Sequence, residues 1–404
     1  RPPPRCLGRF GDTCYHRRRD MKRQPAGDEI RLGPDEWDHA IATSDGPQLV
    51  VAGPGAGKTE FIVRRVAHLV DQGIDPRTIV VLTFSRRGAA ELTARIRAAI
   101  DGDKPAPRAS TFHSLAARIV EAFGDAIGWT EPPALLTGPE QVDLVARLLA
   151  EEPVSAWPVG FQPLLTSRSF AEEVTDFLLR AREYKLGHDG IASAAEGRAD
   201  WVALPRFDAT YEQALADLHR LDYASLILAA TNIATADGVA EDLAGDITHV
   251  LVDEYQDTTA AQADFLASLI AESGNLTVAA DPYQSIYSFR GAALENVEAF
   301  PDRFRSRDGT PARRVVLTTS FRVPAGILHP AERLTAGDLP GAAGPVAPVG
   351  TGGRVDVHVF DQRTHEADWI AAEIHRLHLA EQIPLARMAV AVRSTRRLLP
   401  DLSR

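Results

Sequence analysis

The stretch Gln48-Leu-Val-Val-Ala-Gly-Pro-Gly-Ala-Gly-Lys-Thr59 runs from apolar residues into a glycine-rich loop and then into helix-forming sequence. This pattern predicts a strand, a phosphate-binding loop and a helix. Because the loop glycines lack a Cβ, several backbone N–H groups can point at phosphate oxygens, and the helix adds the positive end of its dipole. Lys58 can reach the β- and γ-phosphates, and the Thr59 hydroxyl can bind Mg²⁺. We assign phosphate binding to Ala52, Gly53, Pro54, Gly55, Ala56, Gly57, Lys58 and Thr59, with Ala52 where the usual pattern begins with glycine.

The composition is that of an ordinary globular protein, with 404 residues, 45% hydrophobic and 25% charged. This length can bury two or three cores. A net charge of -11 argues against a globally basic nucleic-acid coat protein but is compatible with a local basic groove. The only cysteines, Cys6 and Cys14, precede the folded body, which fits a reducing compartment. Without a membrane-spanning run or a signal peptide, we expect a cytoplasmic protein with no membrane partner.

Short, nearly continuous apolar runs bounded by turns recur along the chain, as is typical of buried parallel strands. They are Gln48–Ala52, Thr78–Phe84, Arg108–Phe112, His249–Asp253, Leu276–Asp281 and Arg314–Thr319. Helical patterns lie between several of them, so the sequence predicts an α/β fold with a doubly wound parallel sheet. Ligands of such sheets bind at the carboxyl ends of the strands.

Amphipathic helices replace the strand pattern in the middle of the chain, which predicts a helical insertion into the α/β domain. Two of its helices are expected at Glu140–Glu151 and Ser169–Tyr184. The second helix is expected to open with a capping box formed by Ser169 and Glu172.

A linker rich in Gly, Pro and Ala at Thr335–Gly353 precedes the expected start of a second α/β domain. That domain should contain strands Val355–Phe360 and Met388–Val392 around a helix at Glu366–His378. Met21 is an alternative start, and the basic tail before residue 28 is expected to be disordered and solvated, with nucleic-acid contact as the alternative. We therefore expect a tail at 1–27, a first α/β domain at 28–113 and 247–320, the insertion at 114–246, and the linker with the start of the second domain at 321–404.

The run His249-Val-Leu-Val-Asp-Glu254 is an apolar strand that ends in two carboxylates. Alone, such an ending is common and mostly structural. Downstream of a phosphate-binding loop, it divides two tasks between neighbours, because Asp253 can bind Mg²⁺ while Glu254 polarises the attacking water. Gln256 and Asp257 extend the motif to Asp-Glu-x-Gln-Asp.

Together these motifs resemble those of the UvrD/Rep-type superfamily 1 DNA helicases. The resemblance rests on six motifs in family order: Ala52–Thr59 (motif I), Thr83–Ala90 (Ia), Thr111–Ser114 (Ib), Val252–Asp257 (II), Ala280–Ala292 (III) and Ser320–Arg322 (IV). It implies a P-loop NTPase of RecA-like fold, with the start of a second RecA-like domain after the linker. The family's motifs V and VI do not occur, so the chain resembles an N-terminal fragment.

The resemblance implies roles for residues outside the phosphate loop. Gln284 would sense the γ-phosphate, and Arg290 and Arg322 would meet the nucleotide phosphates. Phe84, Tyr287 and Phe289 would stack on the bases of single-stranded DNA, while Thr111 and His113 would line the path of that DNA strand. Taken singly, the aromatics also fit a core and the arginines also fit surface ion pairs.

Two positions depart from the family pattern at the expected adenine site. Glu36 stands where the family's Gln reads adenine, and an ionised carboxylate can only accept hydrogen bonds. Phe321 replaces the common Tyr of motif IV, which still permits stacking on the base. Selectivity for ATP is therefore expected to be weaker.

The resemblance implies an ATP- and Mg²⁺-dependent helicase or translocase acting on single-stranded DNA and on ss/ds junctions, with 3′-to-5′ polarity, in repair or recombination. One alternative is the N-terminal part of a RecB/AddA-like helicase-nuclease. The other is a nucleotide-binding module that does not hydrolyse ATP. The sequence identifies no protein partner, and we expect the 404-residue chain itself to be unable to unwind duplex DNA.

Overall fold

The computed structural model describes residues 29–42, 46–100, 102, 104–271, 274–288, 291–335, 342, 344 and 346–392. The expected basic tail at 1–27 lies outside these residues. The chain divides into two compact units, one ending at Thr351 and the other beginning at Gly352, and each is described by itself. In the described ranges, no helix is both long and apolar enough to cross a lipid bilayer.

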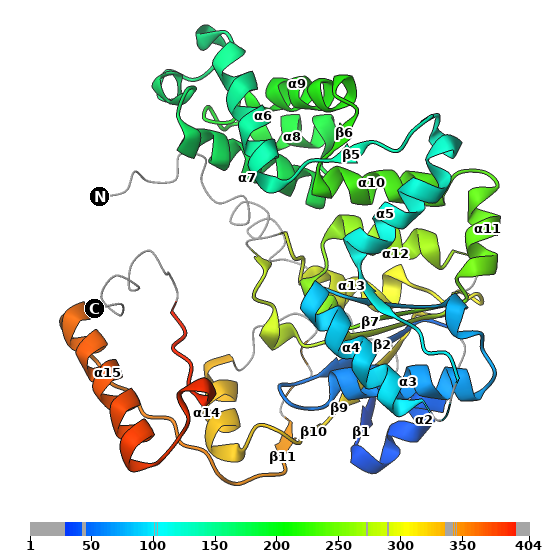
Figure 1. Cartoon of the computed structure of the whole chain (residues 1–404), viewed down its shortest axis with the longest axis vertical. Coiled ribbons are helices and arrows are strands. Elements are labelled where there is room, and N and C mark those ends of the chain that lie inside the picture. The colour runs from blue at the N-terminus through cyan, green and yellow to red at the C-terminus, as the bar shows by residue number, and fades with distance from the viewer. Residues whose placement is uncertain are drawn as a thin grey trace. The chain divides into compact units, whose positions relative to one another are not determined.

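A seven-stranded parallel sheet forms the centre of the first unit, with the strand order β1-β9-β2-β8-β7-β3-β4 (Figure 1). Its strands are β1 (Glu29–Leu32), β2 (Gln48–Ala52), β3 (Ile79–Thr83), β4 (Ala109–Thr111), β7 (His249–Val252), β8 (Leu276–Ala280) and β9 (Arg313–Leu317). All the strands predicted for this sheet are confirmed, with ends that differ by a residue or two. The prediction missed β1, an edge strand whose Glu29 carboxylate pairs with Arg314 on β9 at 3.0 Å.

Side chains of the sheet alternate between two apolar layers, because successive strand residues point to opposite faces. Val50 and Ala52 face one layer, formed with helices α2 (Trp37–Ala42), α3 (Lys58–Asp71) and α4 (Arg86–Ala99). Leu49 and Val51 face the other. That layer is formed with α5 (Phe112–Phe123), α10 (Tyr223–Ala234), α11 (Val239–Asp246), α12 (Ala260–Leu269) and α13 (Glu295–Arg303). The result is the predicted doubly wound α/β fold, covered on both faces.

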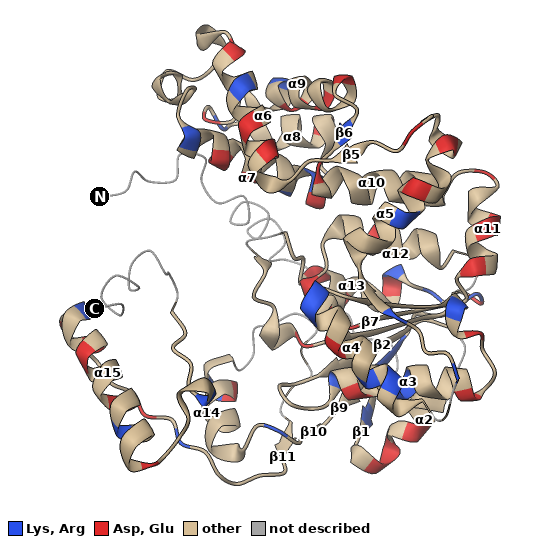
Figure 2. Ribbon diagram, viewed as in Figure 1, with Lys and Arg blue, Asp and Glu red and all other residues tan. Residues whose placement is uncertain are grey.

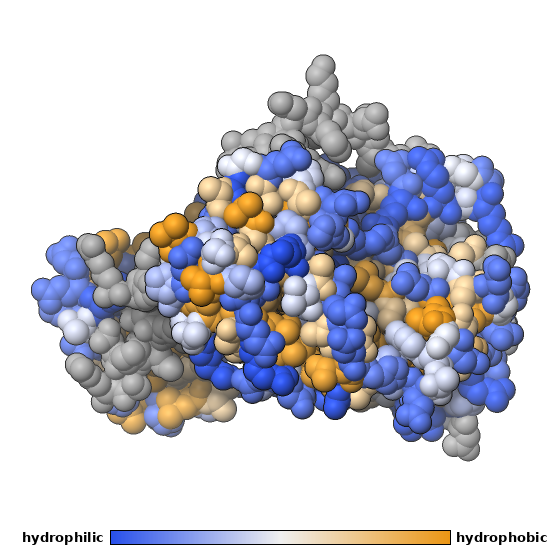
Figure 3. Space-filling view, turned by 90° about the horizontal axis from the view of Figure 1, so that it is seen from above, coloured by the Kyte–Doolittle hydropathy of each residue, from blue (hydrophilic) through white to orange (hydrophobic). Residues whose placement is uncertain are grey.

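A separate helical core lies in the middle of the chain and is built from α6 (Gly138–Glu151), α7 (Arg168–Glu183), α8 (Gly187–Ala195) and α9 (Leu204–Asp217). Trp157, Phe170, Trp201 and Phe207 are among its buried residues. Seen from above in Figure 3, hydrophilic residues surround smaller hydrophobic areas on the surface. Acidic and basic side chains are interspersed along the ribbon (Figure 2), and acidic residues outnumber basic ones most strongly in the helical part of the chain.

Two details of this helical part differ from the sequence-based expectation. Helix α7 begins at Arg168 after Ser167, so Ser169 lies inside the helix and the predicted capping box with Glu172 is wrong. The Ser169 hydroxyl instead contacts that of Ser167 at 2.9 Å. A short parallel pair, β5 (Ala134–Leu135) with β6 (Arg220–Leu221), also occurs where no strand was expected.

The chain after β9 contains a small sheet and two further helices. Strands β10 (Thr319–Ser320) and β11 (Ala347–Pro348) pair, and α14 (Ala325–Thr335) lies between them in sequence. The second unit contains α15 (Arg363–Ala380), which confirms the predicted helix. The strands predicted at Val355–Phe360 and Met388–Val392 are wrong, since neither range is a strand in the described residues. Val357 and Val359 are 84% and 89% exposed, and alternating apolar residues form a strand only beside a pairing partner.

Candidate active site

The glycine-rich loop joins the carboxyl end of β2 to the amino end of α3. Gly55 and Gly57 have φ values of 73° and 92°, in the left-handed region that glycine adopts at little cost. A Cβ at position 57 would lie 2.6 Å from Cη2 of Trp37. Ala56 N–H donates to the Gly53 carbonyl at 3.1 Å, which closes the loop. The glycines therefore serve both the turn and the close packing of Trp37.

Lys58 and Thr59, the first residues of α3, each contact a carboxylate that follows a neighbouring strand. The Thr59 hydroxyl donates to Asp253 Oδ2 at 2.8 Å, just after β7. The Lys58 ammonium lies 3.3 Å from Asp281 Oδ2, just after β8, and both of these side chains are buried. Since β8 lies between β2 and β7, the strand order brings both acids to the loop.

Burial of these carboxylates changes their acidity. Burial, together with the Glu254 carboxylate, raises the pKa of Asp253 to about 6, against the hydrogen bond from Thr59. Burial also raises the pKa of Asp281, although the Lys58 ammonium opposes the rise. Asp257 follows the same rule, because burial and the Glu254 charge raise its pKa to about 7. The site therefore concentrates acidic groups that proton or cation binding would neutralise.

Glu254 has a left-handed backbone, with φ 59° and ψ 43°. Its Oε2 accepts a hydrogen bond from Gln256 Nε2 at 2.7 Å, and its N–H donates to Asp253 Oδ1 at 3.1 Å. Gln284 donates to Asp281 Oδ2 at 2.7 Å, the same oxygen that faces Lys58. The predicted phosphate sensor Gln284 and the lysine predicted to bind phosphate thus share one carboxylate.

Sequence reasoning missed the roles of Asp281 and Gln256. In sequence, Gln256 only extends the Asp-Glu motif, and the signal for its role is the Asp-Glu-x-Gln-Asp spacing. Asp281 is only a position within motif III in sequence, and its local sequence does not indicate which strand lies beside it.

Of the two residues expected to bind the base, Phe321 lies beside the loop. Phe321 is 50% exposed, its N–H donates to the Gly55 carbonyl at 3.0 Å, and its ring meets Trp37 edge-on at 6.0 Å. The Glu36 carboxylate accepts the Gly33 N–H at 2.8 Å, so it caps the turn that begins at Pro34. Arg322 is exposed next to Phe321.

The residues predicted to contact DNA fall into two groups. Phe84 and Tyr287 stack on each other, with ring centroids 4.3 Å apart and planes at 24°. Thr111 caps α5 by accepting the Ser114 N–H at 3.2 Å. His113 meets Tyr223 edge-on at 5.5 Å, and burial lowers the pKa of His113. Phe289 and Arg290 lie outside the described residues.

Thr59 and Asp253 fit a magnesium site. Their oxygens converge at 2.8 Å, and hydroxyl and carboxylate oxygens are the hard ligands that Mg²⁺ prefers. Within the described ranges, no group of three or more His, Cys, Asp or Glu side chains would hold a metal ion by itself. Mg²⁺ in phosphate-transfer sites usually needs only one or two carboxylates, because phosphates and water supply its other ligands.

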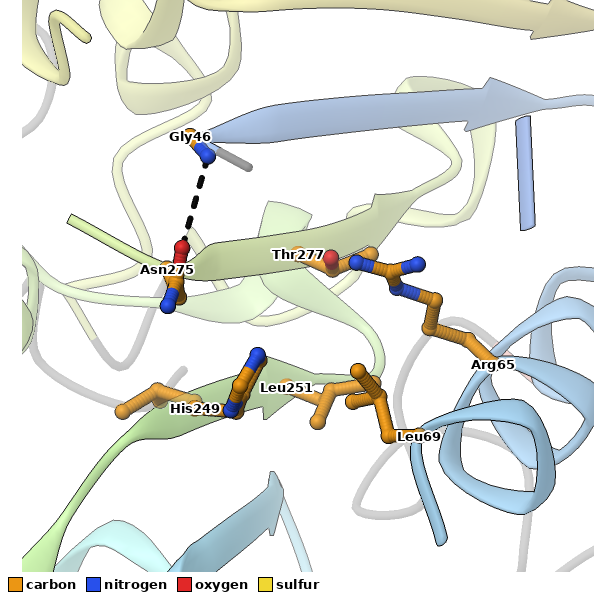
Figure 4. Close-up of a pocket in the computed structure, with 8 residues that line it drawn as sticks. Gly46, Arg65, Leu69, His249, Leu251, Asn275 and Thr277 are labelled. Atoms are coloured by element: carbon orange, nitrogen blue, oxygen red, sulfur yellow. Dashed lines mark hydrogen bonds between the residues drawn. The ribbon is translucent and has the colours of Figure 1, made fainter. Parts of the chain in front are cut away.

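A narrow hollow lies at the amino ends of the strands, whereas this site lies at their carboxyl ends (Figure 4). It lies near the amino ends of β7 and β8, where Gly46 N–H donates to Asn275 Oδ1 at 3.4 Å. Arg65 and Leu69 of α3 also line it, and Arg65 is buried. Phosphates bound by the glycine-rich loop would lie at the carboxyl edge instead.

Comparison with known proteins identifies the family of the chain. Residues 34–305 match the family described as the UvrD/REP helicase N-terminal domain. The chain is similar to the ATP-dependent DNA helicase PcrA of Staphylococcus aureus, with 27% identity over 84% of this chain and 45% of that protein. It is also similar to PcrA of Staphylococcus epidermidis, with 29% identity over 74% of this chain and 39% of that protein. The chain thus spans less than half the length of these relatives. Because the matched region covers most of the chain, the protein belongs to the UvrD/REP helicase family.

Proposed function

We propose that this protein hydrolyses ATP to move along single-stranded DNA and to separate strands at ss/ds junctions. The observation that carries the proposal is the convergence of Lys58, Thr59, Asp253 and Glu254 on the carboxyl edge of one parallel sheet. Family membership and similarity to relatives named ATP-dependent DNA helicases support it. Because the chain spans less than half of those relatives, the proposal concerns the whole protein.

The chain's own residues divide the work of hydrolysis. Backbone N–H groups of the loop from Gly53 to Gly57 would bind the phosphates, and Lys58 would leave Asp281 to meet the β- and γ-phosphates. Thr59 and Asp253 would hold Mg²⁺, which neutralises developing charge on the phosphates. Glu254 would orient the attacking water and accept its proton. Gln284, Arg290 and Arg322 would respond to the γ-phosphate.

DNA would bind across the motif Ia and motif III loops. The stacked pair of Phe84 and Tyr287 offers partly exposed aromatic faces beside the turn that contains Gln284. Phe289, Thr111 and His113 are proposed as further contacts. Tyr287 and Gln284 lie in one short segment. A movement of Gln284 in response to the γ-phosphate would therefore also move Tyr287, on which bases would stack. We propose 3′-to-5′ movement and a role in repair or recombination, as implied by the family resemblance.

Phosphate release distinguishes this function from a binding module without turnover. The protein expressed from its full open reading frame should release phosphate from ATP, and single-stranded DNA should stimulate the release severalfold. Binding of ATP without release would contradict the proposal. A helicase-nuclease would in addition degrade DNA in the presence of Mg²⁺.

A further inference from the structure

We propose that Gln256 is a positioning residue that orients the carboxylate of Glu254. It also links Glu254 to Asp281, whose carboxylate pairs with Lys58. The inference rests on the proposed ATPase function and adds a residue to its mechanism. Gln256 is 1% exposed, so its amide is buried, and it lies between Glu254 and Asp281.

Both ends of the Gln256 amide have defined partners. Its Nε2 donates to Glu254 Oε2 at 2.7 Å, and its Oε1 accepts the Asp281 backbone N–H at 2.9 Å. A backbone N–H can only donate and an ionised carboxylate can only accept, so the amide orientation follows from its partners. Exchanging the amide oxygen and nitrogen would break both bonds.

One oxygen of Glu254 is therefore occupied by a neutral donor. Within the described residues no hydrogen bond engages the other oxygen, Oε1, which leaves it available to a water molecule. A carboxylate aimed in this way can orient and deprotonate a water, whereas one with free rotation would do so in only some of its rotamers.

The backbone of Glu254 also needs external support. A non-glycine residue with φ 59° is uncommon and persists only where its surroundings hold it. The hydrogen bond from Gln256 holds the Glu254 side chain, and the hydrogen bond from Glu254 N–H to Asp253 holds its backbone.

The other partner of Gln256 connects it to the phosphate loop. Asp281 donates its N–H to Gln256 while its carboxylate faces Lys58 at 3.3 Å and accepts from Gln284 at 2.7 Å. When a phosphate draws Lys58 away, the remaining contacts of Asp281 change. Gln256 carries that change to Glu254 through two hydrogen bonds.

The test compares Gln256→Met with the unaltered protein, both expressed from the full open reading frame. Methionine keeps the length of the side chain and removes both hydrogen bonds. Single-turnover ATP hydrolysis with single-stranded DNA should fall roughly 10- to 100-fold. Affinity for a fluorescent, non-hydrolysable ATP analogue should stay within about threefold, because the loop that holds the phosphates is unchanged.

Gln262→Met is the matched control for loss of a buried glutamine. Gln262 is 6% exposed and its Oε1 accepts the Thr259 N–H at 3.1 Å, which caps α12. This variant should lower the unfolding temperature without the tenfold loss of hydrolysis.

A combination with Glu254→Gln decides whether Gln256 acts through Glu254. Adding Gln256→Met to Glu254→Gln should leave the small residual rate unchanged. Hydrolysis by Gln256→Met within twofold of the unaltered protein would overturn the inference. So would an equal loss in affinity and rate, or a further tenfold loss in the Glu254→Gln background. If the unaltered protein hydrolyses no ATP, the proposed function fails and the inference fails with it.

Discussion

Lys58 and Asp281 form an ion pair across 3.3 Å, in which the two side chains are 8% and 0% exposed. The pair gives the buried Lys58 ammonium an acidic partner. A phosphate that binds Lys58, as proposed, would have to compete with Asp281, whose carboxylate would keep its hydrogen bonds from Gln284 and the Tyr283 N–H.

Lys58→Ala should abolish ATP turnover, because it removes the basic side chain of the glycine-rich loop. It should also destabilise the protein by about 3 kcal/mol at pH 8, since a buried carboxylate loses its ion-pair partner. The loss should be smaller at pH 5, where Asp281 without its lysine is more readily protonated. Phosphate release and urea unfolding at the two pH values measure these effects. Normal turnover would remove Lys58 from the mechanism.

Asp257→Asn should stabilise the protein at pH 8. The folded-state pKa is raised to about 7, above the usual 3.8, so the folded protein binds this proton more tightly than the unfolded chain. Stability from this group is therefore fully present below about pH 4 and lost as pH rises toward 7. Asparagine removes the buried charge and keeps an acceptor for the Ile286 N–H, and the gain should be on the order of 2 kcal/mol at pH 8 and much smaller at pH 5.

The control for this prediction is Asp308→Asn. Asp308 is exposed, and hydrogen bonds from Thr310 lower its pKa, so its neutralisation should not stabilise the protein at pH 8. Urea unfolding without nucleotide or Mg²⁺ measures both variants. If Asp257→Asn and the unaltered protein are equally stable at pH 8, the buried charge of Asp257 does not destabilise the folded protein and the prediction is contradicted.

Phe84→Ala and Tyr287→Ala should each weaken binding of single-stranded DNA by about 1–3 kcal/mol. Because the two rings stack at 4.3 Å, the double variant should lose less than the sum of the single losses. Phe321→Ala is the control, since that exposed ring lies at the glycine-rich loop and should affect nucleotide affinity alone. Fluorescence anisotropy of a labelled oligonucleotide measures binding. Unchanged DNA affinity in the double variant would make the pair structural.

Glu36→Gln should sharpen discrimination of ATP over GTP, because an amide can both donate to and accept from adenine. The glutamine oxygen can still accept the Gly33 N–H, so stability should change by less than about 0.5 kcal/mol. Competition between the two nucleotides for the fluorescent analogue measures the preference. An unchanged preference would mean that this side chain only caps the turn and that the base is held by stacking.

The fold was predictable wherever burial dominates the sequence pattern. Nearly continuous apolar runs such as Leu276–Ala280 indicate central strands, because strands buried on both faces are mostly apolar. The edge strand β1 alternates charged and apolar residues and was missed. The alternation at Val355–Phe360 predicts a strand that the structure lacks, because local sequence does not reveal whether a pairing partner is present.

The site was predictable to the extent that it consists of short motifs. The phosphate loop and the Asp253-Glu254 pair carry their chemistry in sequence, and the structure places them together. The roles of Asp281 and Gln256 depend on β8 lying between β2 and β7. Strand order is a property of the whole sheet, so no local pattern could assign these contacts.

Strand displacement is the most direct test of the central claim that ATP hydrolysis at this site drives DNA unwinding. The protein expressed from its full open reading frame would be mixed with a duplex bearing a 3′ single-stranded tail, with ATP and Mg²⁺, beside its Glu254→Gln variant. We predict ATP-dependent displacement by the unaltered protein and none by the variant, which should still bind ATP. Equal displacement by both proteins, or none by either under conditions where both bind DNA and ATP, would contradict the account.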